Sequence, residues 1–181
     1  MRVTRTEIAE VLILEPRVFR DQRGFFLESY NQRAFRDATG IDVEFVQDNH
    51  SRSAKNVLRG LHYQITQPQG KLVRVTAGEI WDVAVDLRVS SATFGKWVAF
   101  GLSAEAKRIV WIPPGFAHGF LVTSSVAEVQ YKTTDYYAPE HDRTLLWNDP
   151  VLAIPWPLEG DPVVAEKDRR GTPLAAADTY P

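Results

Sequence analysis

Apolar and polar residues alternate along the middle of the chain in short runs. The clearest run spans residues 79–88. Its alternate positions form two sets, with Ile80, Asp82, Ala84 and Asp86 in one set and Trp81, Val83, Val85 and Leu87 in the other. Because the side chains of a β-strand point alternately to opposite sides, this run predicts a strand in a sheet with two different faces.

Other strand-like runs lie before and after this one. Gly78, the serine pairs 90–91 and 124–125, and residues 103–105 separate them, as expected for turns. The predicted strands cover residues 71–77, 96–102, 108–112, 119–123 and 128–133. Many short strands at this spacing predict an all-β fold, a sandwich or a barrel.

One short helix is predicted in the first half of the chain. It begins at Asn31, a residue type that caps helix N-termini well, and ends at Gly40, which can adopt a left-handed conformation. Phe35 is its obvious buried residue. A few short helices of this kind leave the fold in the all-β class.

The last part of the chain has a different composition. Prolines recur after Trp147, which favours an extended segment that wraps over the barrel rather than a second domain. A length of 181 residues also fits one domain. We therefore expect a single domain over residues 1–181, with a barrel core at roughly 45–150 and a C-terminal tail at 151–181.

Charge and composition exclude several partners and chemistries. The net charge of -2 leaves no basic excess to attract nucleic acid or an anionic membrane surface. The chain has no cysteine, which excludes disulfides, thiolate catalysis and zinc sites built on sulfur. Its first residues have neither the long apolar run of a signal peptide nor a membrane span, so we expect a cytoplasmic location.

Two histidines stand in glycine-containing, apolar surroundings. His62 lies in Arg-Gly-Leu-His-Tyr-Gln, residues 59–64, and His118 lies in Pro-Pro-Gly-Phe-Ala-His-Gly, residues 113–119. Barrels of the cupin type commonly bind a metal through a His-x-His pair, a nearby Glu and a later His. In this chain the position two residues after His62, where that pair has its second histidine, is Gln64, and no carboxylate occurs at 65–69. Good metal ligands are therefore too few, and we expect no metal.

Acid/base chemistry is the alternative that these histidines favour. Their ordinary pKa of about 6.5 suits proton transfer near neutral pH. A histidine base works best beside a carboxylate, and the candidates are Asp82, Asp86 and Asp168, among which spacing does not choose. One or both histidines could equally be hydrogen-bonded residues of the barrel without a catalytic role.

A series of longer motifs covers nearly the whole chain. The motifs occupy residues 21–28, 46–51, 57–64, 70–75, 111–120, 131–137, 147–150 and 166–170. In this order they resemble the dTDP-4-dehydrorhamnose 3,5-epimerase family. The resemblance implies a cupin-type jelly roll that needs no metal or cofactor and works as a homodimer.

The resemblance also implies a reaction. The substrate would be dTDP-4-dehydro-6-deoxy-D-glucose, in which C3 and C5 both lie beside the C4 ketone. Removing either proton gives an enolate that can be reprotonated from the opposite face. The product would be dTDP-4-dehydro-L-rhamnose.

The family's catalytic roles match particular positions of this sequence. By resemblance, His62 is the general base, Asp168 the carboxylate paired with it, and Tyr131 the acid on the other face. Lys71 would provide a cation near the developing enolate oxygen, and His118 would line the pocket as a hydrogen-bond donor.

Other matched positions would bind the nucleotide. Arg23 and Arg59 match residues that hold the pyrophosphate, where the planar guanidinium fits phosphate oxygens well. The remaining candidates, partly supplied across the dimer, are Phe26, Glu28, Gln47, Asn49, Tyr137, Asp142 and Lys167. Each also has an ordinary structural interpretation, such as a surface ion pair or a core aromatic residue.

Three alternatives to the double epimerase stay open at this point. A relative that epimerises only C3 or only C5 would have the same barrel and base. A catalytically silent cupin that binds a nucleotide sugar is a second alternative. A metal-dependent dioxygenase of this fold is a third, and Gln64 argues against it.

Overall fold

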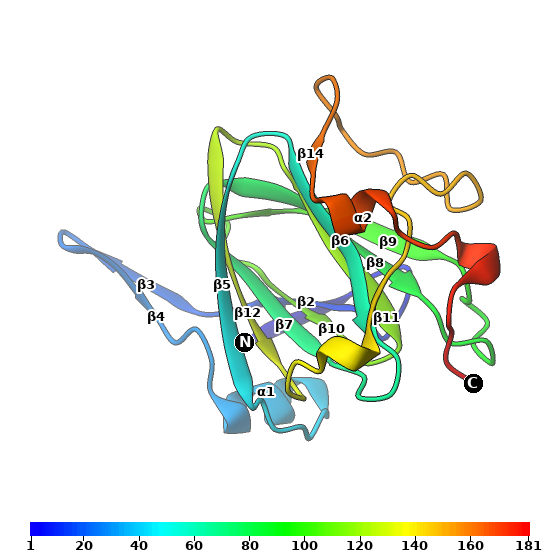
Figure 1. Ribbon diagram of the computed structural model, residues 1–181. Helices are drawn as coiled ribbons and strands as arrows, with labels where there is room; N and C mark the ends of the chain where they lie inside the picture. The colour runs from blue at the N-terminus through cyan, green and yellow to red at the C-terminus, as the bar shows by residue number, and fades with distance from the viewer.

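Two β-sheets face each other in the computed structural model, which describes residues 1–181 (Figure 1). The first sheet has the strand order β1, β2, β10, β7, β12, β5, with antiparallel neighbours. Its strands are β1 (Arg2–Arg5), β2 (Leu12–Glu15), β10 (Ile109–Ile112), β7 (Lys71–Ala77), β12 (Val126–Thr133) and β5 (Gln47–Ala54). The predicted strand at 71–77 is confirmed.

The second sheet has the order β13, β6, β11, β8, β9, and β14 pairs in parallel with β6. Its strands are β13 (Asp142–Thr144), β6 (Val57–Gln64), β11 (Phe116–Val122), β8 (Glu79–Asp86), β9 (Trp97–Ser103) and β14 (Val163–Val164). The strand predicted at 119–123 begins earlier, at Phe116, because residues 116–118 already pair with β8. The fold is the expected all-β arrangement, with two sheets that are not joined into one closed barrel.

The main core lies between the two sheets. Ile80 and Ala84 of β8 belong to it, together with apolar residues of β7, β10, β11 and β12. Val83, Val85 and Leu87 belong to a second apolar cluster with residues of the C-terminal tail. The alternating pattern of β8 therefore predicted correctly that its sheet has two different faces.

The predicted helix is confirmed as α1 (Gln32–Thr39). The side chain of Asn31 accepts a hydrogen bond from the Ala34 N–H, and Gly40 ends the helix in the left-handed conformation. Phe35 packs edge-on against Trp111 of β10, in a third apolar cluster. This cluster also contains residues of β2, so strands before residue 45 contribute to the packed body of the fold.

A hairpin of β3 (Val18–Asp21) and β4 (Gly24–Leu27) projects away from both sheets (Figure 1). Three of its phenylalanines are largely exposed, namely Phe19, Phe25 and Phe26. Among the helices of the chain, none is both long and apolar enough to cross a membrane.

The C-terminal tail runs along the outer side of the second sheet (Figure 1). Trp156 packs edge-on against Trp81 of β8, with ring centres 5.2 Å apart, and its indole N–H donates to the Trp147 carbonyl. Beyond this anchor the tail forms β14, then helix α2 (Glu166–Arg169), and it includes the 3-10 helix η2 (Leu174–Ala176). Tail packing thus determines where α2 lies.

Replacing Trp156 with alanine should lower the free energy of unfolding by about 3–4 kcal/mol, because it leaves a cavity under the tail. Urea denaturation followed by circular dichroism measures this loss. The matched control is Val151→Ala in the same tail, where the side chain is 72% exposed and the change should stay below about 0.5 kcal/mol. Equal losses for the two variants would contradict a stabilising role for the Trp156 contact.

Candidate active site

A cavity of about 720 Å³ opens between the sheets. Residues of β5, β7 and β12 line it from the first sheet, and residues of β6 and β11 from the second. Tail residues 163–165, 167 and 168 complete one wall. The cavity brings together 11 predicted site residues: Gln47, Asn49, Arg59, His62, Lys71, His118, Tyr131, Tyr137, Asp142, Lys167 and Asp168.

His62 and Asp168 form a hydrogen-bonded pair in this cavity. The His62 Nε2 lies 2.6 Å from Oδ1 of Asp168, whose side chain is almost fully buried. The other carboxylate oxygen, Oδ2, accepts a hydrogen bond from the Gly60 N–H at 3.1 Å. Asp168 is therefore held from both sides, and the carboxylate fixes the orientation of the imidazole.

Gly60 lets the backbones of β6 and β11 lie unusually close together beside the two histidines. Its φ of 122° lies in the region that favours glycine, and a Cβ at this position would lie 2.6 Å from the Gly119 Cα. The two glycines let β6 and β11 approach closely beside the histidines. The glycine that precedes His62 in the motif is thus explained by backbone packing.

The environment changes the proton affinities of the pair. Burial lowers the pKa of His62, although Asp168 opposes that shift through its hydrogen bond and charge. Burial alone would raise the pKa of Asp168, but the hydrogen bond and charge of His62 and the Gly60 N–H outweigh it, so that this pKa lies below its ordinary value. A neutral imidazole beside a carboxylate is the form needed to accept a proton.

Tyr131 extends from the opposite sheet. It lies on β12, paired with Asn49 of β5, and lines the same cavity as His62 of β6. Burial raises the pKa of its phenol, and its hydroxyl makes no hydrogen bond within the chain. A protonated phenol therefore faces the cavity from one wall and an imidazole from the other.

Lys71 is a buried cation in the floor of the cavity. Its Nζ donates to the His62 carbonyl at 3.1 Å, and its side chain is 7% exposed. Burial lowers its pKa to about 8, although the charges of Asp142 and Asp82 oppose the shift. The ammonium is thus present at neutral pH without a carboxylate in direct contact.

His118 forms a second histidine–carboxylate pair, in which both side chains are buried. Its Nε2 lies 2.9 Å from Oδ2 of Asp82, which is fully buried on β8. Asp86, the other carboxylate on that strand, instead accepts hydrogen bonds from Arg88, Ser91 and Thr93. Of the three carboxylates left open by the sequence, only Asp168 reaches His62.

Charged and polar side chains surround the mouth of the cavity. The Lys167 Nζ lies 2.8 Å from Oδ2 of Asp142, and the Tyr137 hydroxyl also contacts that oxygen, at 3.3 Å. Burial alone would lower the pKa of Lys167, but its contact with Asp142 outweighs that effect and raises it. The Arg59 Nε donates to the Ser53 hydroxyl at 2.9 Å, which leaves the guanidinium near the mouth.

Three predicted site residues lie outside the cavity of their own chain. Arg23 and Phe26 belong to the projecting hairpin, and Glu28 follows it. The Arg23 guanidinium forms an ion pair with Asp21, and Phe26 is 70% exposed. A single chain therefore does not bring these residues to His62.

The cavity also contains residues that the sequence analysis did not select. Examples are Ser51, Gln69 and Phe120. Ser51 lies two positions after Asn49 on a strand, so the two-residue period could have identified it. No pattern in the sequence indicated the other residues.

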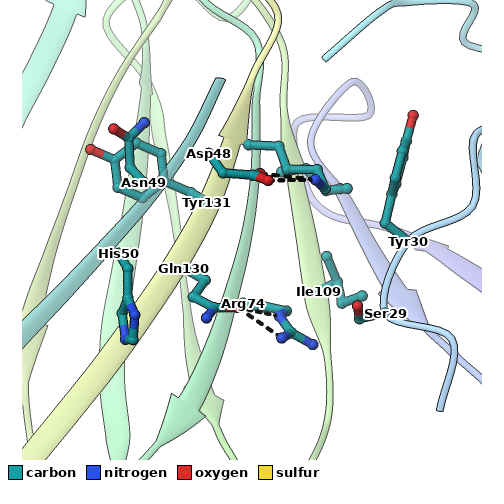
Figure 2. A pocket seen from close by; sticks show the side chains of 11 residues that line it. Ser29, Tyr30, Asp48, Asn49, His50, Arg74, Ile109, Gln130 and Tyr131 are labelled. Atoms are coloured by element: carbon teal, nitrogen blue, oxygen red, sulfur yellow. Dashed lines mark hydrogen bonds and ion pairs between the residues drawn. The ribbon is translucent and has the colours of Figure 1, made fainter. Parts of the chain in front are cut away.

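A second cavity, of about 280 Å³, lies on the side of the first sheet that faces away from the core (Figure 2). Arg74 is bonded to Gln130 there, and the Lys132 Nζ to Asp48 at 2.8 Å. Tyr30 lies across the groove from these pairs. Asp48 and Lys132 pair with each other there, and Arg74 bonds to a neutral amide. Tyr131 lines this cavity as well as the first, but His62, Asp168 and Lys71 line only the first.

The chain contains no group of three or more His, Asp or Glu side chains placed to hold a metal ion. Gln64, which follows His62 where a second histidine would provide a ligand, binds backbone atoms instead. Its Nε2 donates to the Gln67 and Tyr136 carbonyls, and its Oε1 accepts from the Ala138 N–H. The donor set therefore does not fit a metal site.

Comparisons with known proteins agree with this geometry. The family model described as dTDP-4-dehydrorhamnose 3,5-epimerase matches residues 5–176. A protein of that name from Pseudomonas aeruginosa is 64% identical over the full length of both chains, and one from Escherichia coli is 60% identical over 94% of this chain and 92% of its own. A 3,5-epimerase structure from Legionella pneumophila, in complex with dTDP-4-keto-L-rhamnose, is 51% identical and has a TM-score of 0.96, covering 98% of this chain and 94% of that one.

Replacing Lys71 with methionine should stabilise the fold. The lowered pKa, about 8 against an ordinary 10.5, means that burial of the ammonium costs on the order of 3 kcal/mol below pH 8. Loss of the Nζ hydrogen bond offsets about 1 kcal/mol of the gain, so we expect a net increase of about 2 kcal/mol in the free energy of unfolding at pH 7.

The pH dependence tests the cause of this gain. The cost of the buried charge is complete below pH 8 and fades as the pH rises toward 10.5, because the folded chain loses the proton first. Urea denaturation at pH 7 and pH 10 should therefore show a smaller gain at pH 10. Lys55→Met, at an exposed lysine, is the control and should show no such gain; a pH-independent effect of Lys71→Met would contradict the explanation.

Proposed function

The chain belongs to the dTDP-4-dehydrorhamnose 3,5-epimerase family, and we propose that His62 and Tyr131 carry out its reaction from opposite walls of the cavity. The enzyme inverts C3 and C5 of dTDP-4-dehydro-6-deoxy-D-glucose to give dTDP-4-dehydro-L-rhamnose. The single observation that carries the proposed roles is that an imidazole and a phenol face the same cavity from different sheets. Inversion at carbon requires a proton to leave one face and arrive at the other.

Proton removal is assigned to His62. A proton on C3 or C5 is acidic because the resulting carbanion is an enolate, with its charge on the C4 oxygen. His62 accepts the proton, and Asp168, at 2.6 Å, stabilises the imidazolium that forms. The low pKa of Asp168 keeps this carboxylate charged throughout.

The enolate oxygen needs a positive group or hydrogen-bond donors. Lys71 is a buried ammonium in the cavity, and His118 lines it nearby. Fixed groups of this kind, aimed at a developing oxyanion, often lower the barrier more than any other catalytic effect. A pKa of about 8 also keeps the Lys71 proton available below that pH.

Reprotonation is assigned to Tyr131. Its burial keeps the phenol protonated, and its hydroxyl has no partner in the chain to compete for the proton. Donation to the enolate carbon from the first sheet inverts the centre. The phenolate regains a proton from solvent, and His62 releases the one that it took.

The nucleotide is assigned to the mouth of the cavity. Arg59 and Lys167 supply positive charge for a diphosphate, and the half-exposed ring of Tyr137 offers a surface on which a base can stack. Gln47, Asn49 and Asp142 supply polar groups around this ring. The dTDP-sugar is thus held by its nucleotide, while the sugar reaches His62.

Deuterium exchange should distinguish this enzyme from a mono-epimerase or a silent binding protein. In D2O the wild-type chain should place deuterium at both C3 and C5 of the substrate and form the L-sugar, as followed by NMR. Tyr131→Phe should still allow exchange at C5 through His62, but with the configuration retained, because the acid on the opposite face is missing.

His62→Ala is the control and should incorporate no deuterium at either carbon. Label at one carbon alone in the wild type would instead indicate a mono-epimerase. No label despite dTDP binding would indicate a silent nucleotide-sugar-binding protein. Unchanged product formation by Tyr131→Phe would show that another group is the acid.

The proposal includes a homodimer in which each hairpin reaches the other copy's cavity. Two observations support it: the hairpin exposes three phenylalanines away from its own body, and Arg23 and Phe26 lie outside their own cavity. Exposed aromatic residues on a projecting arm are typical of an interface. A cytoplasmic location stays a prediction.

Mixing two inactive variants tests this arrangement. One chain carries His62→Ala, and the other carries Arg23→Ala with Phe26→Ala. If the hairpin acts across the dimer, each mixed dimer has one intact site, and random mixing should restore about a quarter of wild-type activity. No recovery, after refolding the two chains together, would place the hairpin residues in their own chain's site. Light scattering provides the mass of each sample.

A further inference from the structure

Gln64 lines the cavity, and its side chain makes three hydrogen bonds, all of them to backbone atoms. Its side chain is buried, with 3% exposed. The Nε2 group donates to the Gln67 carbonyl at 2.8 Å and to the Tyr136 carbonyl at 3.1 Å, and Oε1 accepts from the Ala138 N–H at 2.8 Å. Two of these three bonds reach the residues immediately before and after Tyr137.

The position of Gln64 itself is fixed by the strand that carries it. It is the last residue of β6, two positions after His62, and pairs with Asp142 of β13. Its carbonyl also accepts a hydrogen bond from the Tyr180 hydroxyl, at 2.6 Å, from the end of the tail. The amide is therefore anchored to the rigid part of the site.

The segment that it holds would otherwise have few attachments. Tyr136 and Tyr137 are both more than half exposed, and the segment leads from β12 into the 3-10 helix η1 (Pro139–His141) without strand pairing of its own. The one further backbone contact of Tyr137 is its N–H, which donates to Oε1 of Gln47 at 3.0 Å. Without Gln64, Tyr137 would be held only by this bond and by the contact of its hydroxyl with Asp142 at 3.3 Å, so its ring would have more freedom to move.

We propose that Gln64 is a positioning residue for nucleotide binding, which holds Tyr137 at the mouth of the cavity through the backbone on both sides of it. The inference rests on the proposed function, since it assigns Tyr137 to the nucleotide. An amide is required because the site presents two carbonyls and one N–H. Only a group that both donates and accepts satisfies all three.

A role of Gln64 in positioning Tyr137 would affect nucleotide binding but not proton transfer. The Gln64 side chain makes no hydrogen bond to His62 or Tyr131. A mobile Tyr137 would have to be ordered each time the nucleotide binds, which weakens affinity. We therefore expect a loss in the binding of ligands that contain the base, with little change in the proton-transfer steps.

The first experiment uses Gln64→Met, which keeps the length of the side chain and removes all three hydrogen bonds. The Kd for dTDP, measured by calorimetry, and the KM for the sugar substrate should both rise about tenfold. The kcat and its pH profile should stay within about twofold of the wild type. The Kd for inorganic pyrophosphate, which has no base, should not change.

Ser124→Ala is the matched control. The Ser124 hydroxyl also bonds to backbone atoms: it accepts from the Glu79 N–H and donates to the Val126 carbonyl at 2.8 Å. It lies at the turn between β11 and β12 and does not line the cavity. This variant should lower the melting temperature and leave the Kd for dTDP unchanged. If Gln64→Met behaves in the same way, with lower stability and normal Kd, Gln64 is merely structural and the inference is wrong.

A double-mutant cycle shows whether Gln64 acts through Tyr137. Tyr137→Ala alone should weaken dTDP binding, and adding Gln64→Met should weaken it no further, because the ring that Gln64 positions is gone. Additive losses would overturn the inference. Should Gln64→Met not fold, Gln64→Glu keeps the acceptor for the Ala138 N–H, and the same cycle applies to it.

The two proposals fail in different ways. A wild-type chain that neither binds dTDP nor converts the substrate would refute the proposed function. A wild-type chain that does both, together with a normal dTDP Kd for the Gln64 variants, would refute only the role of Gln64.

Discussion

The contact between His62 and Asp168 joins two parts of the chain that are 106 residues apart in the sequence. Asp168 lies on the short helix α2, which cannot hold a stable position by itself because four residues make barely one turn. Its position depends on the tail, and the tail is fixed by apolar packing on the outer side of the second sheet, with Trp156 against Trp81. Hydrophobic packing on the outer side of the sheet therefore helps to place the carboxylate that contacts His62 on the inner side.

Opposed sheets provide what the epimerisation needs in space. The side chains of two facing sheets point into the same volume from opposite sides, so an acid and a base on different sheets approach a bound sugar from different faces. A site built on one sheet alone would return the proton to the side from which it came. The two apolar clusters on either side of β8 keep this geometry rigid, because the strand that pairs with β11 is packed on both faces.

Local sequence patterns predicted part of this fold. The elements that they missed depend on the polar lining of the cavity or on contacts between distant parts of the chain. The alternation in β8 and the caps of α1 are local properties, and both predictions were confirmed. The strand β5 was not predicted, because every one of its residues from Gln47 to Ser53 is polar: one side lines the cavity and the other faces outward. An alternation of apolar and polar residues cannot identify a strand such as β5, because polar residues that line the cavity stand where a core strand would have apolar ones. The choice of Asp168 over Asp82 and Asp86 needed either the family resemblance or the coordinates, since no spacing rule reports a contact made by a distant tail.

The interior of the cavity also shows what the active groups cost the fold. Lys71, Asp82 and His118 occupy positions between the sheets that apolar side chains could fill, and burial of such groups is unfavourable unless each has a partner. Asp82 and His118 satisfy one another, and Asp168 is bonded on both oxygens, but Lys71 has only a carbonyl. The pKa of Lys71 is lowered because burial of the ammonium is not fully compensated by a partner. A cation without a carboxylate in contact can stabilise a negative charge that appears only during a reaction, so the unfavourable burial of Lys71 is consistent with the role that we propose for it at the enolate oxygen.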